Sequence, residues 1–305
     1  MTVAVIIPTY NGAHKIMTAL KALEQQNFKA DEVIVVVDGS TDNTVELLNN
    51  YQFSLNNFKV IDQENQGRAG VRNSGAKVAK SDLLVFMDDD MKPEYNWLNA
   101  HNEHHTKHND SILTAAAIDI PVKNGTDYQD FRANLSVTWA KELEIYNNQP
   151  IPKEKVFITA ANFSLSKKTF EKTNGFDIIL NDGEDYDLAI RATKLNIPIY
   201  YNSSACAWHL EKNSCAYNIK RTRGYYHAGR VLLEQRPEIY EPIFGNRRNM
   251  TKGFKAKAFL VFCRSFWIKS IDQDFWKWLP KRLRYKLYDL VITANGIFFP
   301  EKVKL

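Results

Sequence analysis

The fold of this chain is decided by the stretch Leu83-Leu84-Val85-Phe86-Met87-Asp88-Asp89-Asp90, in which five apolar residues run directly into three acids. A short apolar run bounded by polar residues is typical of a strand buried in a parallel sheet. Carboxylates at the end of such a strand lose hydration, which is unfavourable unless a cation or hydrogen-bond donors compensate them. Asp88 and Asp90 are one residue apart, so both can face one divalent ion that also binds phosphate oxygens.

Other apolar runs surround this stretch and alternate with segments of helical character. The predicted strands are Val3–Ile7, Glu32–Val37, Lys59–Ile61, Leu83–Met87 and Asn162–Ser166, and the predicted helices include His14–Gln25 and Ala69–Ala79. Strands that alternate with helices across short connections indicate an α/β parallel sheet. Polar residues follow the first four strands, at the carboxyl ends where open α/β sheets bind ligands.

A second acidic cluster, Gly183-Glu184-Asp185-Tyr186-Asp187, follows about ninety-five residues after the first. One cluster for a metal and a diphosphate, and another for proton abstraction, is what transfer of a sugar from a nucleotide requires. Each cluster also has a structural interpretation. The first could form a turn or a helix N-cap, and the second could complement a helix dipole. A lone D-x-D pattern is weak evidence for function.

Short motifs occur in an order that points to a family. They are Val5-Ile6-Ile7-Pro8-Thr9-Tyr10-Asn11-Gly12, Val36–Asp42, Asn65–Arg68 with Arg72-Asn73, Phe86–Asp90, Asn174–Asp177, Gly183–Leu188 and Trp208-His209. With these motifs the chain resembles the family 2 glycosyltransferases, which are inverting enzymes with the GT-A fold. The resemblance covers roughly Val3 to His209. It departs from the family at Val37, where many relatives carry a second Asp before Asp38.

The resemblance implies roles for residues on the donor side. Asp38 would accept a hydrogen bond from a uracil imide N–H, and Arg68 would lie near the base or a phosphate. A solvated arginine at a helix start is the alternative for Arg68. Asp88 would hold the ribose or the water shell of a metal. The predicted nucleotide-sugar-binding residues are Pro8, Thr9, Asn11, Asp38, Arg68, Asp88 and Asp89.

The resemblance also implies a metal centre and a base. Asp90 and His209 would bind Mn²⁺ or Mg²⁺, which neutralises the departing diphosphate, and an imidazole beside carboxylates favours Mn²⁺. A lone histidine is otherwise more often structural. Asp185 would be the catalytic base that takes the proton of the acceptor hydroxyl. Glu184 would bind the acceptor or, alternatively, pair with Arg191.

Two other groups of residues are assigned no chemistry. Four histidines between His101 and His108 fall at helical spacing, but the segment is polar and lacks H-E-x-x-H, so it predicts a solvated helix rather than a metal site. The three cysteines form no C-x-x-C pair. Without a signal peptide they predict reduced thiols in the cytoplasm.

The expected fold class is α/β, with a GT-A-like, Rossmann-type nucleotide-binding sheet merged with an acceptor-binding half, and a mainly helical C-terminal extension. Residues 1–215 are expected to form the glycosyltransferase domain, with 1–110 as the nucleotide-sugar half and 111–215 as the acceptor half. Residues 216–305 would form the extension. No run of eighteen apolar residues occurs, so no transmembrane helix is expected.

The C-terminal part is strongly basic. From Arg247 to Leu305 it carries fourteen Lys and Arg against four Asp and Glu, a net charge of +10 in a chain whose total is +5. Trp267, Trp276 and Trp278 lie among these residues. Basic residues interleaved with aromatic ones suit an anionic membrane surface, which would make the protein peripheral on the inner face of the cell membrane. A helical cap packed on the catalytic domain is the equal alternative. Nothing matches a nucleic-acid-binding motif, so nucleic acid is not an expected partner.

The resemblance therefore implies an inverting, metal-dependent glycosyltransferase of the hexosyltransferase type. It would move a sugar from a UDP-linked donor to a hydroxyl of a saccharide or polyprenyl-linked acceptor, as in polysaccharide or cell-envelope biosynthesis. A sugar nucleotidyltransferase is an alternative, but that class expects a Gly-rich, basic loop where this chain has Pro8–Gly12. A non-catalytic sugar-binding relative is a third, against which Asp90, Asp185 and His209 argue. No motif specifies the donor sugar or the acceptor.

Overall fold

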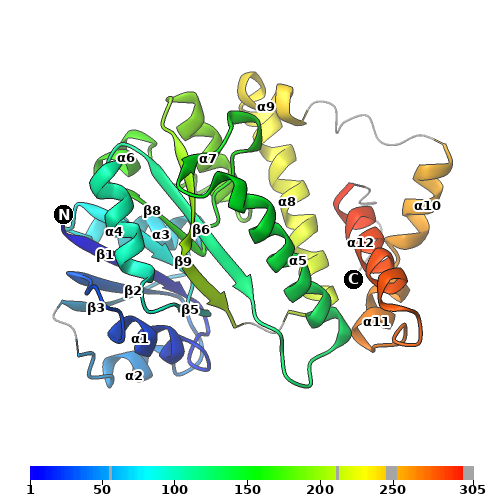
Figure 1. Ribbon diagram of the computed structural model, residues 1–305, viewed down its shortest axis with the longest axis horizontal. Helices are drawn as coiled ribbons and strands as arrows, with labels where there is room; N and C mark the ends of the chain where they lie inside the picture. Colours follow the sequence, from blue (N-terminus) through cyan, green and yellow to red (C-terminus); the bar gives the residue numbers. More distant parts are fainter. Residues whose placement is uncertain (55–56, 211–212, 245–252, 298–305) are drawn as a thin grey trace. The chain divides into compact units, whose positions relative to one another are not determined.

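The computed structural model describes residues 1–54, 57–210, 213–244 and 253–297 (Figure 1). The chain divides into two compact units. The first comprises Met1–Ile120 and Ser136–Glu211, and the second comprises Pro121–Leu135 and Lys212–Leu305. Residues 121–135, which lie within the expected acceptor half, are thus grouped with the second unit.

A mixed β-sheet forms the centre of the first unit (Figure 1). Within the described residues its order is β3-β2-β1-β4-β8-β6-β9-β5, and β7 pairs with β9. The strands are β1 (Val3–Thr9), β2 (Glu32–Asp38), β3 (Phe58–Gln63), β4 (Leu83–Met87), β5 (Met91–Pro93), β6 (Ile112–Asp119), β7 (Gln149–Pro150), β8 (Asn162–Ser166) and β9 (Ile199–His209).

The helices of the first unit connect these strands. They are α1 (Ile16–Glu24), α2 (Thr44–Asn49), α3 (Gly67–Val78), α4 (Trp97–Lys107), α6 (Lys167–Lys172) and α7 (Glu184–Lys194), with 3-10 turns η1 (Glu144–Tyr146) and η2 (Lys153–Lys155). Helix α5 (Asp127–Leu143) begins in the second unit and ends in the first.

Strand direction explains why polar residues gather at one edge of the sheet. Strands β1, β2, β3 and β4 are parallel to one another. Strand β8 is antiparallel to both β4 and β6, and β6 is parallel to β9, so β6 and β9 run in the same direction as the first four. The carboxyl ends of these six strands therefore point to one edge.

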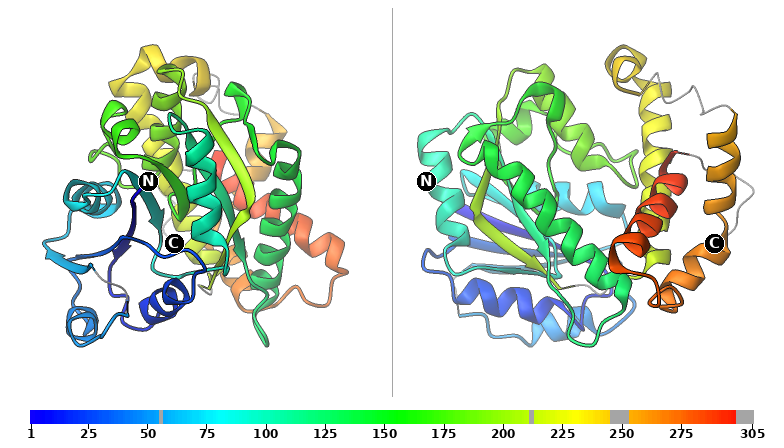
Figure 2. Two further views of the ribbon diagram at one scale, coloured as in Figure 1. Left: turned by 60° about the vertical axis from the view of Figure 1, so that its left-hand side comes forward. Right: turned by 45° about the vertical axis from the view of Figure 1, so that its right-hand side comes forward.

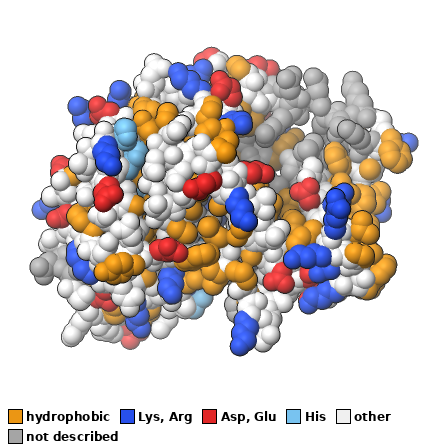
Figure 3. All heavy atoms as spheres, viewed as in Figure 1, with side chains coloured by type: hydrophobic (Ala, Val, Ile, Leu, Met, Phe, Trp, Pro, Cys, Tyr) orange, Lys and Arg blue, Asp and Glu red, His pale blue; other side chains and the backbone are white. Residues whose placement is uncertain are grey.

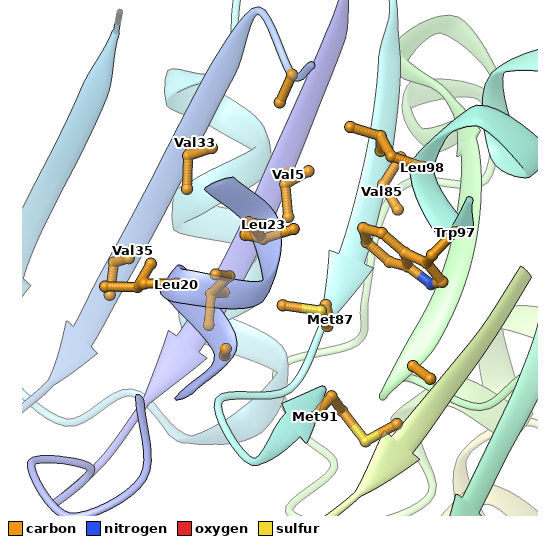
Figure 4. Close-up of a cluster of buried hydrophobic side chains, with 14 of the residues drawn as sticks. Val5, Leu20, Leu23, Val33, Val35, Val85, Met87, Met91, Trp97 and Leu98 are labelled. Carbon is orange, nitrogen blue, oxygen red and sulfur yellow. The ribbon is translucent and has the colours of Figure 1, made fainter. Parts of the chain in front are cut away.

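The core on one face of the sheet is built by α1 and α4. Figure 4 shows Leu20 and Leu23 of α1, and Trp97 and Leu98 of α4, lying over apolar side chains of the central strands. All five residues of β4 have no exposed surface, which explains its unbroken apolar sequence. On α3, a Cβ at Gly75 would clash with Ile6 of β1, so the close approach of this helix to the sheet requires glycine.

The histidine-rich segment is a helix, as predicted, but the prediction that this helix is solvated is wrong. His101, His104 and His105 of α4 are buried against the sheet. Their hydrogen bonds are His101 Nδ1–Ser164 Oγ (2.7 Å), His101 Nε2–Asn162 Oδ1 (3.1 Å), His105 Nε2–Ser164 Oγ (2.9 Å) and His104 Nε2–Ser111 Oγ (2.9 Å). Burial lowers the pKa of His101 to about 3 and that of His104 to about 4. These side chains are therefore neutral core residues, and at least one ring nitrogen of each contacts a serine or asparagine.

The second unit is helical, as expected for the C-terminal extension. It contains the start of α5 with α8 (Cys215–Gln235), α9 (Pro237–Phe244), α10 (Phe254–Phe262), α11 (Ser265–Asp272) and α12 (Lys281–Ile297). Helices α8 and α12 lie side by side (Figure 2). A buried ion pair joins Asp127 at the start of α5 to Arg284 of α12, with N–O distances of 2.6 and 2.7 Å. None of the helices in the described ranges is long and apolar enough to cross a bilayer.

Candidate active site

Side chains from several strands meet at the carboxyl edge of the sheet. Thr9, Asp38, Asp119 and His209 are the last residues of β1, β2, β6 and β9. The acidic triplet follows β4, as predicted. Most of these polar groups are buried or half-buried, so each needs a partner.

His209 lies between two carboxylates. Its Nε2 is 3.2 Å from Oδ2 of Asp90, and its Nδ1 is 2.9 Å from Oδ1 of Asp119. The sheet register aligns Asp119 of β6 with His209 of β9, while β5 pairs Met91, the residue after Asp90, with the same histidine. Burial would lower the pKa of His209, but the two carboxylates outweigh burial and raise it well above its usual value. The imidazolium therefore donates to both acids.

Asp89 is held by Thr9 and Lys15. The Thr9 hydroxyl donates to Oδ2 of Asp89 at 2.6 Å, and the Lys15 ammonium is 3.0 Å from Oδ1. The same ammonium is 3.8 Å from Oδ2 of Asp90. Burial raises the pKa of Asp89 to about 7, although Lys15 opposes this shift. Gly12 closes the loop over this group, because a Cβ there would clash with Thr9 and lie 2.6 Å from Asp89 Oδ2.

The residues at Asp90 and His209 fit a divalent ion. Two ligand atoms bound about 2.1 Å from one octahedral ion, at a right angle, lie about 3 Å apart, and the Asp90 oxygen and His209 nitrogen are 3.2 Å apart. In the described part of the chain, no group of three or more His, Cys, Asp or Glu side chains could hold a metal ion.

Arg72 of α3 connects the two acidic clusters. Its Nη2 donates to Oδ1 of Asp88 at 2.6 Å, and its Nη1 donates to Oε1 of Glu184 at 3.0 Å. The Arg72 side chain is 4% exposed. Burial would lower its pKa, but the two carboxylates raise it, so the guanidinium stays charged. The alternative pairing of Glu184 with Arg191 is not found, because Arg191 instead pairs with Asp187 at 2.7 Å.

Asp185 begins α7 beside Glu184 and is half-buried. Its Oδ2 accepts from the Ala160 amide at 3.2 Å, and its Oδ1 accepts from the Tyr186 amide at 2.8 Å. Burial raises the pKa of Asp185, and these amides only partly oppose it. Burial and the neighbouring Asp185 together raise the pKa of Glu184 to about 7. A carboxylate with a raised pKa is suited to accept a proton near neutral pH.

The loop before α7 is fixed to α3 by Asn73. The Asn73 side chain donates to the Phe176 carbonyl at 2.8 Å and accepts from the Phe176 amide at 3.0 Å. Gly183, at the N-cap of α7, has a φ of 76°. This is a left-handed conformation that glycine adopts without strain. Arg72 and Asn73 therefore hold both ends of the segment that leads to the predicted base.

Asp38 braces the start of α3. Its Oδ1 accepts from the Gln66 amide at 2.8 Å and from Gln63 Nε2 at 2.8 Å, and its Oδ2 accepts from the Gly67 amide at 3.0 Å. Oδ2 receives one of these bonds and can accept a second. The predicted hydrogen bond from the imide N–H of a uracil ring would need such a free acceptor position. Arg68 lies in the first turn of α3 with 38% of its side chain exposed, and its Nε is 3.9 Å from Oδ1 of Asp182.

The remaining predicted donor residues lie on the loop after β1. Pro8 and Asn11 are half-buried. Asn11 has a φ of 49° and its Oδ1 accepts from the Thr41 amide at 2.8 Å, so it ties this loop to the loop after β2. The hydrogen bonds of Asn11 go to the loop after β2 rather than to the acidic triplet. The nucleotide-binding roles of Pro8 and Asn11 therefore stay predictions.

Three residues of the site were not assigned a role from the sequence. Arg72 was noted only as part of a motif, and Lys15 and Asp119 were not singled out. Asp119 carries the same signal as Asp88, an acid directly after an apolar run. Lys15 and Arg72 carry no such local signal. Asp89 lies 74 residues from Lys15, and Asp88 and Glu184 lie 16 and 112 residues from Arg72.

The chain is similar in sequence to known proteins. Residues 4–173 match the family described as Glycosyl transferase family 2. The chain is 38% identical over 95 residues to the putative glycosyltransferase EpsH of Bacillus subtilis. These aligned residues make up 30% of this chain and 28% of EpsH. It is 26% identical over 240 residues to an uncharacterized glycosyltransferase of Haemophilus influenzae, with 72% and 73% covered. The chain is 23% identical over 269 residues to the chondroitin synthase of Pasteurella multocida. The aligned region covers 79% of this chain but only 28% of the synthase.

Solved structures share the fold. TarS 1-349 of S. aureus in complex with UDP-GlcNAc has a TM-score of 0.57 at 18% identity, with 100% of this chain and 98% of that chain covered. The mannosyltransferase PcManGT of Pyrobaculum calidifontis, in complex with GDP-Man and Mn²⁺, has a TM-score of 0.62 at 16% identity, with 98% and 88% covered. At these identities the likeness concerns the fold alone. The predicted GT-A-like fold with its helical extension is confirmed.

The family match covers more than half of the chain and agrees with the order of the motifs. It begins in β1 and ends directly after α6, so it contains the acidic triplet, Lys15 and Arg72. The family predicted from the motifs is thereby confirmed, and this chain belongs to glycosyltransferase family 2.

Proposed function

We propose that the protein is an inverting, metal-dependent glycosyltransferase that moves a sugar from a nucleoside diphosphate donor to an acceptor hydroxyl. The observation that carries the proposal is the position of Arg72, whose guanidinium bonds to Asp88 at 2.6 Å and to Glu184 at 3.0 Å. One side chain thus holds together the acidic cluster suited to a metal and the one suited to a base. A single carboxylate cluster would not supply both functions.

The residues of this chain divide the chemical work. Asp90 and His209 would hold Mn²⁺ or Mg²⁺, and the bound ion would stabilise the charge of the departing diphosphate. Asp185 would take the proton of the acceptor hydroxyl as that oxygen attacks the anomeric carbon from the face opposite the diphosphate. Glu184, fixed by Arg72, would contact the acceptor. Lys15, 3.0 Å from Asp89, would offset the negative charge of the triplet.

The donor and the setting follow from weaker observations. A UDP-linked sugar is favoured because Asp38 Oδ2 can accept a further hydrogen bond, and a TarS structure contains UDP-GlcNAc. PcManGT contains GDP-Man with Mn²⁺, which supports a nucleotide sugar and a divalent ion in general. The chondroitin synthase relative supports a saccharide acceptor in polysaccharide biosynthesis, and a polyprenyl-linked saccharide would serve the same chemistry. The three described cysteines are free, in keeping with action in the cytoplasm.

The test is a screen of purified protein against nucleotide sugars and saccharide acceptors, with Mn²⁺, with Mg²⁺ and with excess EDTA. Release of a nucleoside diphosphate supports transfer, whereas release of pyrophosphate would identify a sugar nucleotidyltransferase instead. NMR of the product would show whether the anomeric configuration is inverted. Undiminished turnover in EDTA would overturn the metal requirement, and Asp90→Ala should abolish turnover while leaving the circular dichroism spectrum unchanged.

A further inference from the structure

The second unit exposes an aromatic cluster on α11 and the turn that follows it. The rings of Trp267 and Trp276 stack at 5.4 Å between centroids. Phe266 packs on Trp267 at 5.5 Å, and Phe275 packs on Trp276 at 5.1 Å. The inner pair is half-buried, but Phe266 is 60% exposed and Phe275 is 59% exposed. Because the ring contacts run without a break, the two exposed rings belong to one patch.

The same turn carries a further exposed ring. Trp278 is 71% exposed, and Leu283 in the first turn of α12 is exposed as well. Single exposed apolar residues are normal on a protein surface. Two phenylalanines, a tryptophan and a leucine within eighteen residues are more than scattered exposure, and a protein surface keeps such groups when they have a partner.

Exposed cations lie on the same elements as these rings. They are Lys269 of α11, Lys277 of the turn, and Lys281, Arg282 and Lys286 of α12. Figure 3 shows hydrophobic and basic side chains intermingled over the right-hand part of the view, where α10 to α12 lie. We name Phe266, Phe275, Trp278, Leu283 and these five cations the α11–α12 surface.

Two of the acids near these cations have other partners. Asp272 is engaged by the amides of Cys215 and Ala216 at 2.6 and 3.0 Å. Asp274 accepts from the Asp127 amide at 2.8 Å and also pairs with Lys277 at 2.7 Å. Lys277 is therefore the one cation of the α11–α12 surface with a recorded acidic partner among the described residues. The other four cations exceed the one further exposed acid on these helices, Asp289 of α12, so the surface carries a net positive charge.

We propose that the α11–α12 surface docks the protein on an anionic lipid bilayer. Aromatic rings favour the headgroup level of a bilayer, and lysine and arginine next to them attract anionic lipids. Both features occur between Phe266 and Lys286 of one unit. A second copy of the protein could bind here only through a complementary acidic surface. A single-stranded nucleic acid could bind the same cations through its phosphates. The test must therefore distinguish both partners from lipid.

Co-sedimentation of the full chain with vesicles tests the proposal. One set contains phosphatidylcholine alone, and the other also contains phosphatidylglycerol. Binding to the anionic vesicles at low salt, weakened by high salt, is the expected result. Each cation near such a surface changes the partition ratio about fivefold at low salt, so Lys281→Glu/Arg282→Glu should reduce it by at least roughly 25-fold. Phe275→Ser/Trp278→Ser should weaken binding to anionic vesicles at both salt concentrations, since apolar burial is not screened.

Matched controls come from exposed residues of the first unit. Lys77→Glu/Lys107→Glu changes the net charge by the same amount, and Tyr95→Ser removes an equally exposed ring. Both should bind vesicles like the unaltered chain, and thermal melting should show that all variants are folded. Equal or absent binding to the two vesicle types would overturn the proposal. Binding of the protein to single-stranded RNA but not to lipid would also overturn it. The same holds if the variants lose self-association and show no other effect. The assay measures no turnover, so its outcome is independent of the proposed transferase reaction.

Discussion

Asp119 lies directly behind His209, with 2.9 Å between Oδ1 of the acid and Nδ1 of the ring. With one ring nitrogen held by Asp119, only Nε2 can face Asp90. A carboxylate behind a metal-binding histidine fixes the ring orientation and makes the nitrogen that faces the metal more basic. Neighbouring strands β6 and β9 supply the pair in register, so the orientation is set by the sheet rather than by a loop.

Asp119→Ala should therefore weaken binding of Mn²⁺ by about 10- to 100-fold, the usual effect of losing such a supporting carboxylate. Calorimetric titration of the variant with Mn²⁺ measures this without any turnover. Asp62→Ala, which removes an exposed acid on β3, is the matched control and should leave the affinity unchanged. An unchanged affinity in Asp119→Ala would show that His209 is positioned by other contacts or does not bind the metal.

Asp185→Asn should keep the affinity for the donor and reduce kcat by about 10²- to 10⁴-fold, because an amide of nearly the same shape is a poor base. Donor binding is measured by calorimetry and turnover by release of the nucleoside diphosphate. In the unaltered protein, turnover should fall as pH decreases, since protonation removes the base. Burial raises the pKa of Asp185, so this loss should begin above the ordinary carboxyl range. A variant with more than about a tenth of the original kcat would place the base elsewhere.

Arg72→Met should lower the free energy of unfolding by about 3–5 kcal/mol, because it leaves the Asp88 and Glu184 carboxylates without their shared cation. Arg68→Met, one turn earlier on α3, is the control. Arg68 is 38% exposed and 3.9 Å from Asp182, so its loss should change stability by about 0–1 kcal/mol. Urea denaturation measures both. A second change, Glu184→Gln, should recover part of the loss in Arg72→Met, and equal losses in the two arginine variants would contradict a buried ion-pair network.

Acidification below pH 6.5 should destabilise the fold through the α4 histidines. The pKa of His101 is lowered to about 3 and that of His104 to about 4 when folded, whereas unfolded histidine keeps a pKa near 6.5. The two unfolded histidines therefore bind more protons between these limits, and their contribution to stability falls with decreasing pH across that window. Each histidine contributes up to about 1.4 kcal/mol per pH unit.

Denaturation midpoints measured between pH 7 and pH 5 check this slope. His101→Gln should make the slope shallower, because it removes one group that gains a proton on unfolding. His14→Gln changes an exposed histidine and should leave the slope as it is. An unchanged slope in His101→Gln would be inconsistent with a buried neutral histidine at this position. The total slope also reflects Asp89 and Glu184, whose pKa values, raised to about 7, act in the opposite direction.

The strands could be predicted because their signal is local. Leu83–Met87 and Asn162–Ser166 form strands with the predicted bounds. Helix ends were less predictable. Helix α3 was expected from Ala69 but begins at Gly67, because Asp38 of β2 accepts the Gln66 and Gly67 amides. This contact between distant residues has no local signal in the sequence.

The acidic residues of the site could be predicted from the sequence more readily than its basic residues. An acid after an apolar run stands out, and the same pattern would have found Asp119. Arg72 was predicted only as part of a motif, since the fold alone brings it to Asp88 and Glu184. The histidine segment was misjudged for a similar reason. Its polar sequence suggested solvent, but Ser164 and Asn162 of β8 supply hydrogen bonds that allow the imidazoles to be buried.

The order of the sheet also has a consequence during synthesis on the ribosome. Strand β4 pairs with β1 on one side, but its other neighbour is β8, whose residues are made about eighty positions later. At about 5–20 residues per second, the nascent chain presents the apolar edge of Leu83–Met87 for about 4–16 s before its partner emerges. An apolar edge strand left open for that long can pair with other chains. Translation pauses between β4 and β8 should therefore lower the yield of soluble protein more than pauses placed after β9.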